Sequence, residues 1–265
     1  MRDAPNTPDE RADARVAPWY EEAFRDDYRE LYAHRNLGAA RAETEWLARE
    51  VLAPVAGPVL DDCCGFGRHS LALRERHVPV VGIDLSFDLL AASAELPRAD
   101  ELLRGRLARA DMRSLPFAEG TFGAVLNLFT SFGYLGDEDD ARALAEMSRV
   151  LAPGGTLVMD LMNPTVVRDG LVPHSIEERA GHRLESRRSL HDGGRRVVKA
   201  VRITLPDGGE RAWKESVRMY EPDELDEALG RASLAPLQRV GDFSGSPFQA
   251  GDSGRQIVVA RRAGA

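Results

Sequence analysis

The sequence predicts an α/β fold of the doubly wound type, in which helices cover both faces of a mostly parallel sheet. Five short runs rich in Val, Ile and Leu alternate with helix-like stretches between residues 58 and 162. Most of these runs lack strict alternation of polar and apolar residues, which is typical of strands buried on both faces. After Pro164 the pattern changes to antiparallel hairpins, so we expect a β insertion after the fifth strand.

Composition limits the class of protein and its partners. The chain has 265 residues, 43% hydrophobic and 29% charged, which suits one large domain with a sizeable core. Its formal net charge of -8 argues against general electrostatic wrapping of nucleic acid. The two cysteines are adjacent, Cys63 and Cys64, and predict neither a disulfide framework nor a four-ligand zinc site. We expect a cytoplasmic protein with no metal, no membrane span and no secretory signal.

The residues ahead of the first strand are expected to form a tail and a helical lid. Residues 1–16 are rich in Pro, Asp, Arg and Ala, which predicts a disordered tail. In residues 17–54, four aromatic side chains recur every fourth position and so share one helical face. They are Tyr20, Phe24, Tyr28 and Tyr32. Such a stripe is more often core packing than a lid, but its place before the first strand favours a lid. A second helix is predicted over residues 37–51.

The sheet elements follow in order along the chain. The predicted strands are residues 58–63, 78–84, 105–111, 122–129 and 155–162. The helices between them are residues 69–77, 86–96 and 139–155, the last stopped by Pro153-Gly154-Gly155.

The remaining residues predict hairpins and then a return to the first sheet. Residues 174–220 carry strong turn signals at 191–194 and 206–209. A helix at 221–233 and strands at 237–243 and 255–262 follow. We therefore assign residues 55–164 and 221–265 to one domain, and residues 165–220 to the antiparallel insertion.

Residues 59–70, VLDDCCGFGRHS, predict a strand, a glycine-rich turn and a helix. Gly65 and Gly67 let the backbone approach a ligand closely, and the helix N-terminus attracts negative charge. A tight turn with only a packing role has the same pattern. The ligand hypothesis gains weight because an aspartate ends each of the first three strands: Asp61, Asp84 and Asp111. Since the carboxyl ends of parallel strands share one edge, these carboxylates should line one crevice.

The three acids also indicate the kind of ligand. Asp61 precedes the glycine turn by four residues and would repel a diphosphate. It favours a ligand that carries an ammonium and a sulfonium at that end. Asp84 is placed to accept from both hydroxyls of a ribose, and Asp111 to accept from the exocyclic amine of an adenine.

These residues resemble the first motif of class I S-adenosylmethionine-dependent methyltransferases. The family pattern D-x-G-x-G-x-G stands here as Asp61 to Gly67, with Cys63 in place of the first glycine. The resemblance implies a Rossmann-like, mostly parallel seven-stranded sheet whose last strand is antiparallel. It also implies the cofactor S-adenosyl-L-methionine, with S-adenosyl-L-homocysteine as product. The cofactor-binding residues it implies are Asp61, Cys63, Gly65, Gly67, Asp84, Leu85, Asp111 and Met112.

Within the family the chain is similar to small-molecule enzymes such as sugar N-methyltransferases and glycine N-methyltransferases. Those enzymes have an antiparallel insertion after strand five and an aromatic N-terminal lid. The resemblance therefore implies methyl transfer by in-line displacement to a nitrogen or oxygen of a small acceptor. It also implies that the acceptor binds beside the insertion. The acceptor-side candidates are Tyr134, Asn127 and Tyr32. Tyr28, Arg35 and Asn127 are further candidates for cofactor contact.

Charge in the insertion leaves the chemistry of the acceptor open. Residues 181–220 contain ten Lys or Arg against five Asp or Glu, inside an otherwise acidic chain. This excess predicts either a solvated sheet face or an anionic acceptor. A homodimer is a further possibility.

Three other functions remain to be weighed. A nicotinamide-dependent oxidoreductase is disfavoured because Ser70 stands where G-x-G-x-x-G needs its third glycine. A non-catalytic S-adenosylmethionine binder or partner subunit would carry the same motif. A protein or nucleic-acid methyltransferase is disfavoured by the acidic composition and by Asn127-Leu128-Phe129-Thr130, which is no Asp/Asn-Pro-Pro-Tyr/Phe motif.

Overall fold

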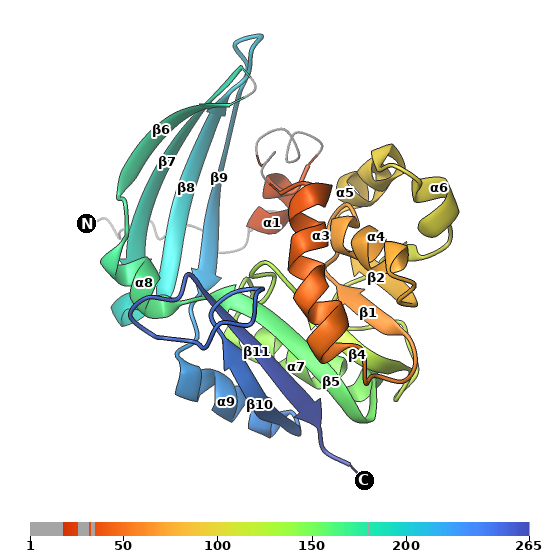
Figure 1. Cartoon of the computed structure of the whole chain (residues 1–265). Helices are drawn as coiled ribbons and strands as arrows, with labels where there is room; N and C mark the ends of the chain where they lie inside the picture. Colours follow the sequence, from red (N-terminus) through yellow and green to blue (C-terminus); the bar gives the residue numbers. More distant parts are fainter. Residues whose placement is uncertain (1–17, 26–31, 33–34, 180, 265) are drawn as a thin grey trace, which may run out of the picture.

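The computed structural model describes residues 18–25, 32, 35–179 and 181–264, and they form two sheets (Figure 1). The larger sheet has seven strands in the order β10-β11-β5-β4-β1-β2-β3. Its strands are β1 (Val59–Asp62), β2 (Val80–Asp84), β3 (Leu107–Arg109), β4 (Phe122–Asn127), β5 (Leu151–Met162), β10 (Leu234–Val240) and β11 (Arg255–Arg262). β1 to β5 pair in parallel, whereas β11 runs antiparallel to both β5 and β10. The predicted fold class and the reversed last strand are confirmed.

Helices cover both faces of this sheet. On one face lie α3 (Leu37–Trp46), a short π-helical turn (Leu47–Val51) and α4 (Arg68–Glu75); on the other lie α7 (Asp137–Val150) and α9 (Pro222–Arg231). α5 (Phe87–Ala92) and α6 (Ala99–Leu102) link β2 to β3, and α8 (Pro164–Asp169) follows β5. Strand β4 shows why its sequence has no polar alternation. Val125 packs with the α7 and α9 side, whereas Ala124 and Leu126 pack with the α3 and α4 side.

The second sheet is a four-stranded antiparallel meander inserted between α8 and α9. It consists of β6 (His174–Arg179), β7 (His182–His191), β8 (Arg196–Thr204) and β9 (Glu210–Arg218). Both predicted turns lie between strands, at residues 192–195 and 205–209. Figure 1 shows this sheet standing away from the larger one, with α1 (Trp19–Ala23) between them. The α1 residue Ala23 packs on its inner face with Val201, Ile203 and Trp213.

Two predicted helices end earlier than the sequence indicates. The aromatic spacing predicts one helical face from Tyr20 to Tyr32, but α1 ends at Ala23 and Phe24 leaves helical geometry. The Phe24 carbonyl accepts a hydrogen bond from Ser86 Oγ instead (2.7 Å). α7 ends at Val150, and the predicted stop residues 153–155 belong to the start of β5. The predicted tail and Tyr28 lie outside the described residues.

Within the described part of the chain, no helix combines the length and apolar character needed to cross a bilayer.

Candidate active site

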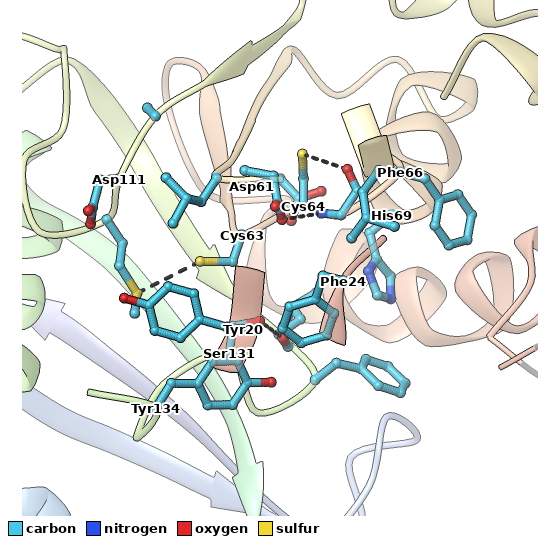
Figure 2. Close-up of a pocket in the computed structure, with 18 of the residues that line it drawn as sticks. Tyr20, Phe24, Asp61, Cys63, Cys64, Phe66, His69, Asp111, Ser131 and Tyr134 are labelled. Atoms are coloured by element: carbon cyan, nitrogen blue, oxygen red, sulfur yellow. Dashed lines mark hydrogen bonds between the residues drawn. The ribbon is translucent and has the colours of Figure 1, made fainter. Parts of the chain in front are cut away.

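A cavity opens at the carboxyl ends of β1, β2, β3 and β4. It encloses about 1030 Å³ including its open mouth, which is at the upper end for a small-molecule site. Side chains of α1 and of the loop after β4 form the opposite wall. Figure 2 shows Asp111 at one end of the cavity and His69 at the other, with Asp61 and Cys63 between them.

The glycine-rich turn after β1 forms the floor of the cavity. Cys63, Gly65 and Gly67 all have positive φ (63°, 59° and 78°), which glycine adopts readily and other residues rarely do. Cys63 therefore keeps the backbone path that a glycine would take at this position. Burial raises the pKa of both cysteine thiols well above the usual value, so these side chains stay protonated. The turn has the geometry expected of a ligand-binding loop.

Asp84, at the end of β2, lines the cavity on the strand between those that carry Asp61 and precede Asp111, and two backbone amides hold its carboxylate. One carboxylate oxygen accepts from the backbone N–H of Gly65 (2.7 Å) and the other from that of Ser86 (2.8 Å). Burial raises the pKa of Asp84, and the two backbone hydrogen bonds oppose that shift. A carboxylate has about four acceptor positions, so capacity remains for two ligand hydroxyls.

Asp61 also lines the cavity, whereas its neighbour Asp62 lies beneath it. Asp61 is buried and accepts a hydrogen bond from Ser70 Oγ (2.6 Å), and burial raises its pKa. A cation placed beside it would gain an unusually favourable interaction, because this carboxylate is removed from water. Asp62 is fully buried and accepts from Asn127 Nδ2 (3.3 Å), so it faces β4 rather than a ligand.

At the end of the cavity away from His69 lies Asp111 (Figure 2), and Met112 and Leu85 also line the cavity. Asp111 pairs with Arg113 (2.6 Å), which also binds Asp139 (2.8 Å). Hydrogen bonds from Arg113 lower the pKa of Asp111, so it is ionised and fixed in direction. The Met112 sulfur lies 3.7 Å from the Cys63 sulfur, so the residues that follow β1 and β3 are in contact beneath the cavity.

Aromatic side chains cover the cavity. Tyr20 and Phe24 line it from α1 and the residue after it, and Tyr134 lines it from the loop after β4. The rings of Phe24 and Tyr134 stack with centroids 6.0 Å apart, and Trp19 lies 4.7 Å from Tyr134. Figure 2 shows Tyr20, Phe24 and Tyr134 grouped together, across the cavity from Asp61. Two members of the predicted aromatic stripe are thus cavity residues.

The structure brings most predicted site residues to the cavity, but three lie elsewhere. Asn127 is fully buried within β4. Tyr32 packs against the second sheet, and its hydroxyl accepts from Lys199 Nζ (3.2 Å). Gly67 caps the start of α4 behind the turn. Tyr28 is outside the described residues, and Arg35 lines the cavity. No group of three His, Cys, Asp or Glu among the described side chains is arranged to hold a metal ion.

A basic cluster at the His69 end of the cavity was missed by sequence reasoning. Arg68 and His69 are buried, and both contact the same Glu43 oxygen of α3, at 2.8 and 2.7 Å. The Arg68 guanidinium lies over the Phe129 ring, 4.2 Å from its centroid. The position of Arg68 directly after the glycine turn is a signal that would have indicated it. Nothing in the local sequence distinguishes Phe129.

The donor set fits S-adenosylmethionine, the cofactor implied by the sequence. Its adenine amine, ribose hydroxyls and amino-acid ammonium each need an acceptor, and Asp111, Asp84 and Asp61 follow one another in that order along neighbouring strands. Apolar side chains such as Leu85 and Leu89 line the cavity between them. The carboxylates of Asp61 and Asp84 suit a ligand that carries a cation and hydroxyl groups, and they disfavour a pyrophosphate beside them.

Comparison with known proteins places this geometry in a family. A family model described as a methyltransferase domain matches residues 59–155. A dTDP-3-amino-3,4,6-trideoxy-alpha-D-glucopyranose N,N-dimethyltransferase from Streptomyces venezuelae is 30% identical over 249 residues, which are 91% of this chain and 98% of that protein. For two other curated methyltransferases the match is shorter, and the chain spans about half of their length (54%).

Solved structures agree with this relationship. The CcbJ methyltransferase from Streptomyces caelestis superimposes with a TM-score of 0.76 at 22% identity, covering 92% of this chain and 98% of that one. The sugar N-methyltransferase KedS8 from Streptoalloteichus superimposes with a TM-score of 0.64 at 26% identity, covering 89% and 92%. With the glycine turn, the row of carboxylates and the reversed last strand, these likenesses lead to one conclusion: the chain belongs to the class I S-adenosylmethionine-dependent methyltransferases.

Proposed function

We propose that this protein transfers a methyl group from S-adenosylmethionine to an amine nitrogen of a small-molecule acceptor. The observation that carries the proposal is Asp84, fixed by two backbone amides at the centre of a row of three cavity carboxylates. The full-length relationship to a protein named as an amino-sugar N,N-dimethyltransferase supports an amine acceptor.

In this proposal four cavity residues hold the cofactor. Asp84 accepts from the ribose hydroxyls, Asp61 faces the ammonium, and Asp111 with the Met112 backbone binds the adenine. When bound, the cofactor would supply a sulfonium methyl group. The lone pair of an amine nitrogen would attack that methyl carbon in line, S-adenosylhomocysteine would leave as the carbon–sulfur bond breaks, and the methylated ammonium would then lose a proton to solvent. The protein aligns the two reactants and keeps water out, which are the main requirements of such a displacement. Tyr20, Phe24 and Tyr134 provide that cover.

The acceptor is proposed to approach from the inner face of the second sheet. A second cavity of about 970 Å³ lies there, between α8 and β6 to β9. Val197 and Val217 give it apolar walls, and Arg188 and Lys199 give it positive charge. An anionic group on the acceptor would meet these two cations. Glu177 and Glu215 line the same cavity, so a zwitterionic or aminated acceptor suits it equally.

A cytoplasmic location is proposed because the chain has only two cysteines, adjacent at Cys63 and Cys64, rather than the disulfide framework of many small secreted domains.

The decisive experiment compares Asp84→Ala with Asp88→Ala by calorimetry. Asp88 is exposed, four residues further along the chain in the first turn of α5, and serves as the matched control. We expect Asp84→Ala to weaken S-adenosylmethionine binding by about 100-fold, because two charge-assisted hydrogen bonds are lost. Asp88→Ala should bind like the wild type. An unchanged affinity in Asp84→Ala would exclude this site.

Turnover separates an enzyme from a binder. Wild-type protein should release S-adenosylhomocysteine in the presence of one or more amines from a panel of amino sugars and amino acids. Binding without turnover on that panel, or turnover only on peptide or nucleic acid, would favour the non-catalytic or macromolecular alternative.

A further inference from the structure

Two consecutive residues of the loop after β4 have a backbone conformation that side chains disfavour. Phe129 and Thr130 each have φ of 58°, in the left-handed region, and neither is glycine. Such a pair persists only where surrounding contacts over-determine it, and such strain is concentrated at functional sites. Specific contacts must therefore hold this loop in its conformation.

Asp160 of β5 and Arg255 of β11 supply those contacts. The Phe129 N–H donates to Asp160 Oδ2 and the Thr130 N–H to the Asp160 carbonyl, both at 2.8 Å. Arg255 donates to Asp160 Oδ1 (2.7 Å) and to Thr130 Oγ1 (2.8 Å). Asp160 is completely buried, so its charge is matched by Arg255 alone among the salt bridges of the described residues. Neither residue lines the cavity, so any effect on a ligand passes through the loop.

The loop presents the Phe129 ring to two cavity arginines. The guanidinium carbon of Arg68 lies 4.2 Å from the ring centroid and that of Arg35 lies 5.3 Å away. Cation–π attraction of this kind orients a guanidinium group relative to an aromatic face. All three residues line the cavity. The Phe129 ring therefore packs against both guanidinium groups and helps to place them, together with Glu43, which pairs with Arg68 (2.8 Å), and Tyr32, whose ring centroid lies 4.9 Å from Arg35.

The strand order indicates which part of the cofactor reaches these arginines. Along the sheet order β3, β2, β1, β4, the cavity residues are Asp111, Asp84, Asp61 and then Phe129. On the proposed function, the first three meet the adenine, the ribose and the ammonium. The group that continues beyond the ammonium is the carboxylate of the amino acid. Guanidinium groups bind carboxylates by paired, charge-assisted hydrogen bonds.

We infer that Asp160 and Arg255 are positioning residues, which hold Phe129 so that Arg68 and Arg35 receive the carboxylate of S-adenosylmethionine. The inference rests on the proposed function, since it assumes that cofactor in this cavity. It assigns no contact between the cofactor and either positioning residue.

The test uses two ligands, S-adenosylmethionine and its decarboxylated form, which lacks only the carboxylate. Wild-type protein should bind the intact cofactor at least about tenfold more tightly than the decarboxylated form. In Asp160→Asn this preference should fall to within about threefold, with the affinity for decarboxylated cofactor nearly unchanged. Arg68→Met should lose the preference in the same way, and Arg255→Lys should retain part of it.

Two further variants keep the test decisive. Phe129→Leu keeps an apolar side chain and removes the aromatic face without leaving a buried charge unpaired. It therefore tests the inference even if Asp160→Asn fails to fold, and it should also lose the preference for the intact cofactor over the decarboxylated form. Asp226→Asn breaks another aspartate–arginine pair, that with Arg239 (2.6 Å), away from the cavity, and should keep the preference.

The outcomes are distinct. Equal weakening of both ligands in Asp160→Asn and Phe129→Leu would overturn the inference, since a merely structural role affects them alike. A wild type that binds both ligands equally would overturn it as well. Failure of the wild type to bind either ligand would instead refute the proposed function.

Discussion

Asp62 is a titratable carboxyl group buried in the interior of the larger sheet. It occupies the end of β1, has no exposed surface, and accepts hydrogen bonds from Asn127 Nδ2 (3.3 Å) and from Cys63 Sγ (4.0 Å). Burial raises the pKa of Asp62 to about 7. The folded protein therefore holds a proton that the unfolded chain releases near the ordinary carboxyl pKa of about 4. Since the native state binds more protons across this range, stability is expected to fall as pH rises from about 4 to 7 and then level off.

Replacing Asp62 with Asn tests this directly. Asp62→Asn has nearly the same size and no titratable proton, so it should be more stable than the wild type at pH 8. The gain should be up to about 4 kcal/mol and should shrink toward pH 4. Urea unfolding at pH 4.5, 6 and 8 measures it, with the exposed Asp88→Asn as control. A gain that is the same at all three pH values would contradict the assigned pKa.

Individual site residues were predictable where the strand pattern placed them. Asp61, Asp84 and Asp111 were predicted because strand ends and a glycine turn are local signals, and all three line the cavity. Asn127 was proposed instead from the family resemblance, and its side chain turns into the sheet toward Asp62. Which way a side chain at a strand end points depends on sheet packing, which the linear sequence does not display.

At the scale of elements, Ser86 links the residue that ends α1 to Asp84 at the end of β2. Its hydroxyl caps α5 by accepting from the Leu89 N–H (3.2 Å) and donates to the Phe24 carbonyl (2.7 Å). Its own N–H donates to Asp84. One residue thus connects the end of α1, the start of α5 and the central carboxylate.

A pair of substitutions separates these roles. Ser86→Asp keeps an acceptor for the α5 cap but has no hydroxyl to donate to Phe24, whereas Ser86→Ala loses both. Backbone amide exchange of Trp19–Ala23 should speed up by about fivefold in both variants, since one hydrogen bond contributes about 1 kcal/mol. Exchange in α5 should speed up only in Ser86→Ala.

Ser93→Ala, which removes another serine-to-carbonyl hydrogen bond nearby, is the matched control and should leave α1 unchanged. Unaltered exchange of α1 in Ser86→Asp would show that Ser86 does not hold it.

The hydrogen bond between Ser86 and the Phe24 carbonyl explains why the sequence could not predict where α1 ends. The strands were recognised because burial on both faces leaves a continuous apolar run, as at residues 122–127. The aromatic helix was overextended because spacing alone favours it. Phe24 leaves the helix where its carbonyl meets Ser86, 62 positions later in the chain, and no window of local sequence contains both residues.

At the scale of the whole molecule, the two sheets are joined at Gly133. Its carbonyl accepts from the Arg218 N–H at the end of β9 (2.7 Å), and its φ is 94°. A Cβ atom there would lie 2.6 Å from the Arg218 carbonyl oxygen, too close for any side chain. Tyr134 follows directly, so the cover of the cavity is anchored to the second sheet.

Gly133→Ala should disturb this junction while sparing the cofactor end. We expect a loss of stability of about 1–3 kcal/mol from the close contact and the positive φ. The KM for the acceptor should rise several-fold, with the Kd of S-adenosylmethionine unchanged. Gly136→Ala is the control, because its φ is -84° and nothing lies within 4 Å of its Cβ position. A cofactor affinity that fell with the acceptor affinity would show that the sheets do not act separately.

The placement of the second sheet has a consequence for how such proteins diversify. It enters after α8 and leaves before α9, and none of the three cavity carboxylates comes from it. On the proposed function, mutations along β6 to β9 change what is methylated without disturbing the supply of the methyl group. Substitutions confined to this one meander can therefore alter acceptor preference while the carboxylates that hold the donor stay unchanged.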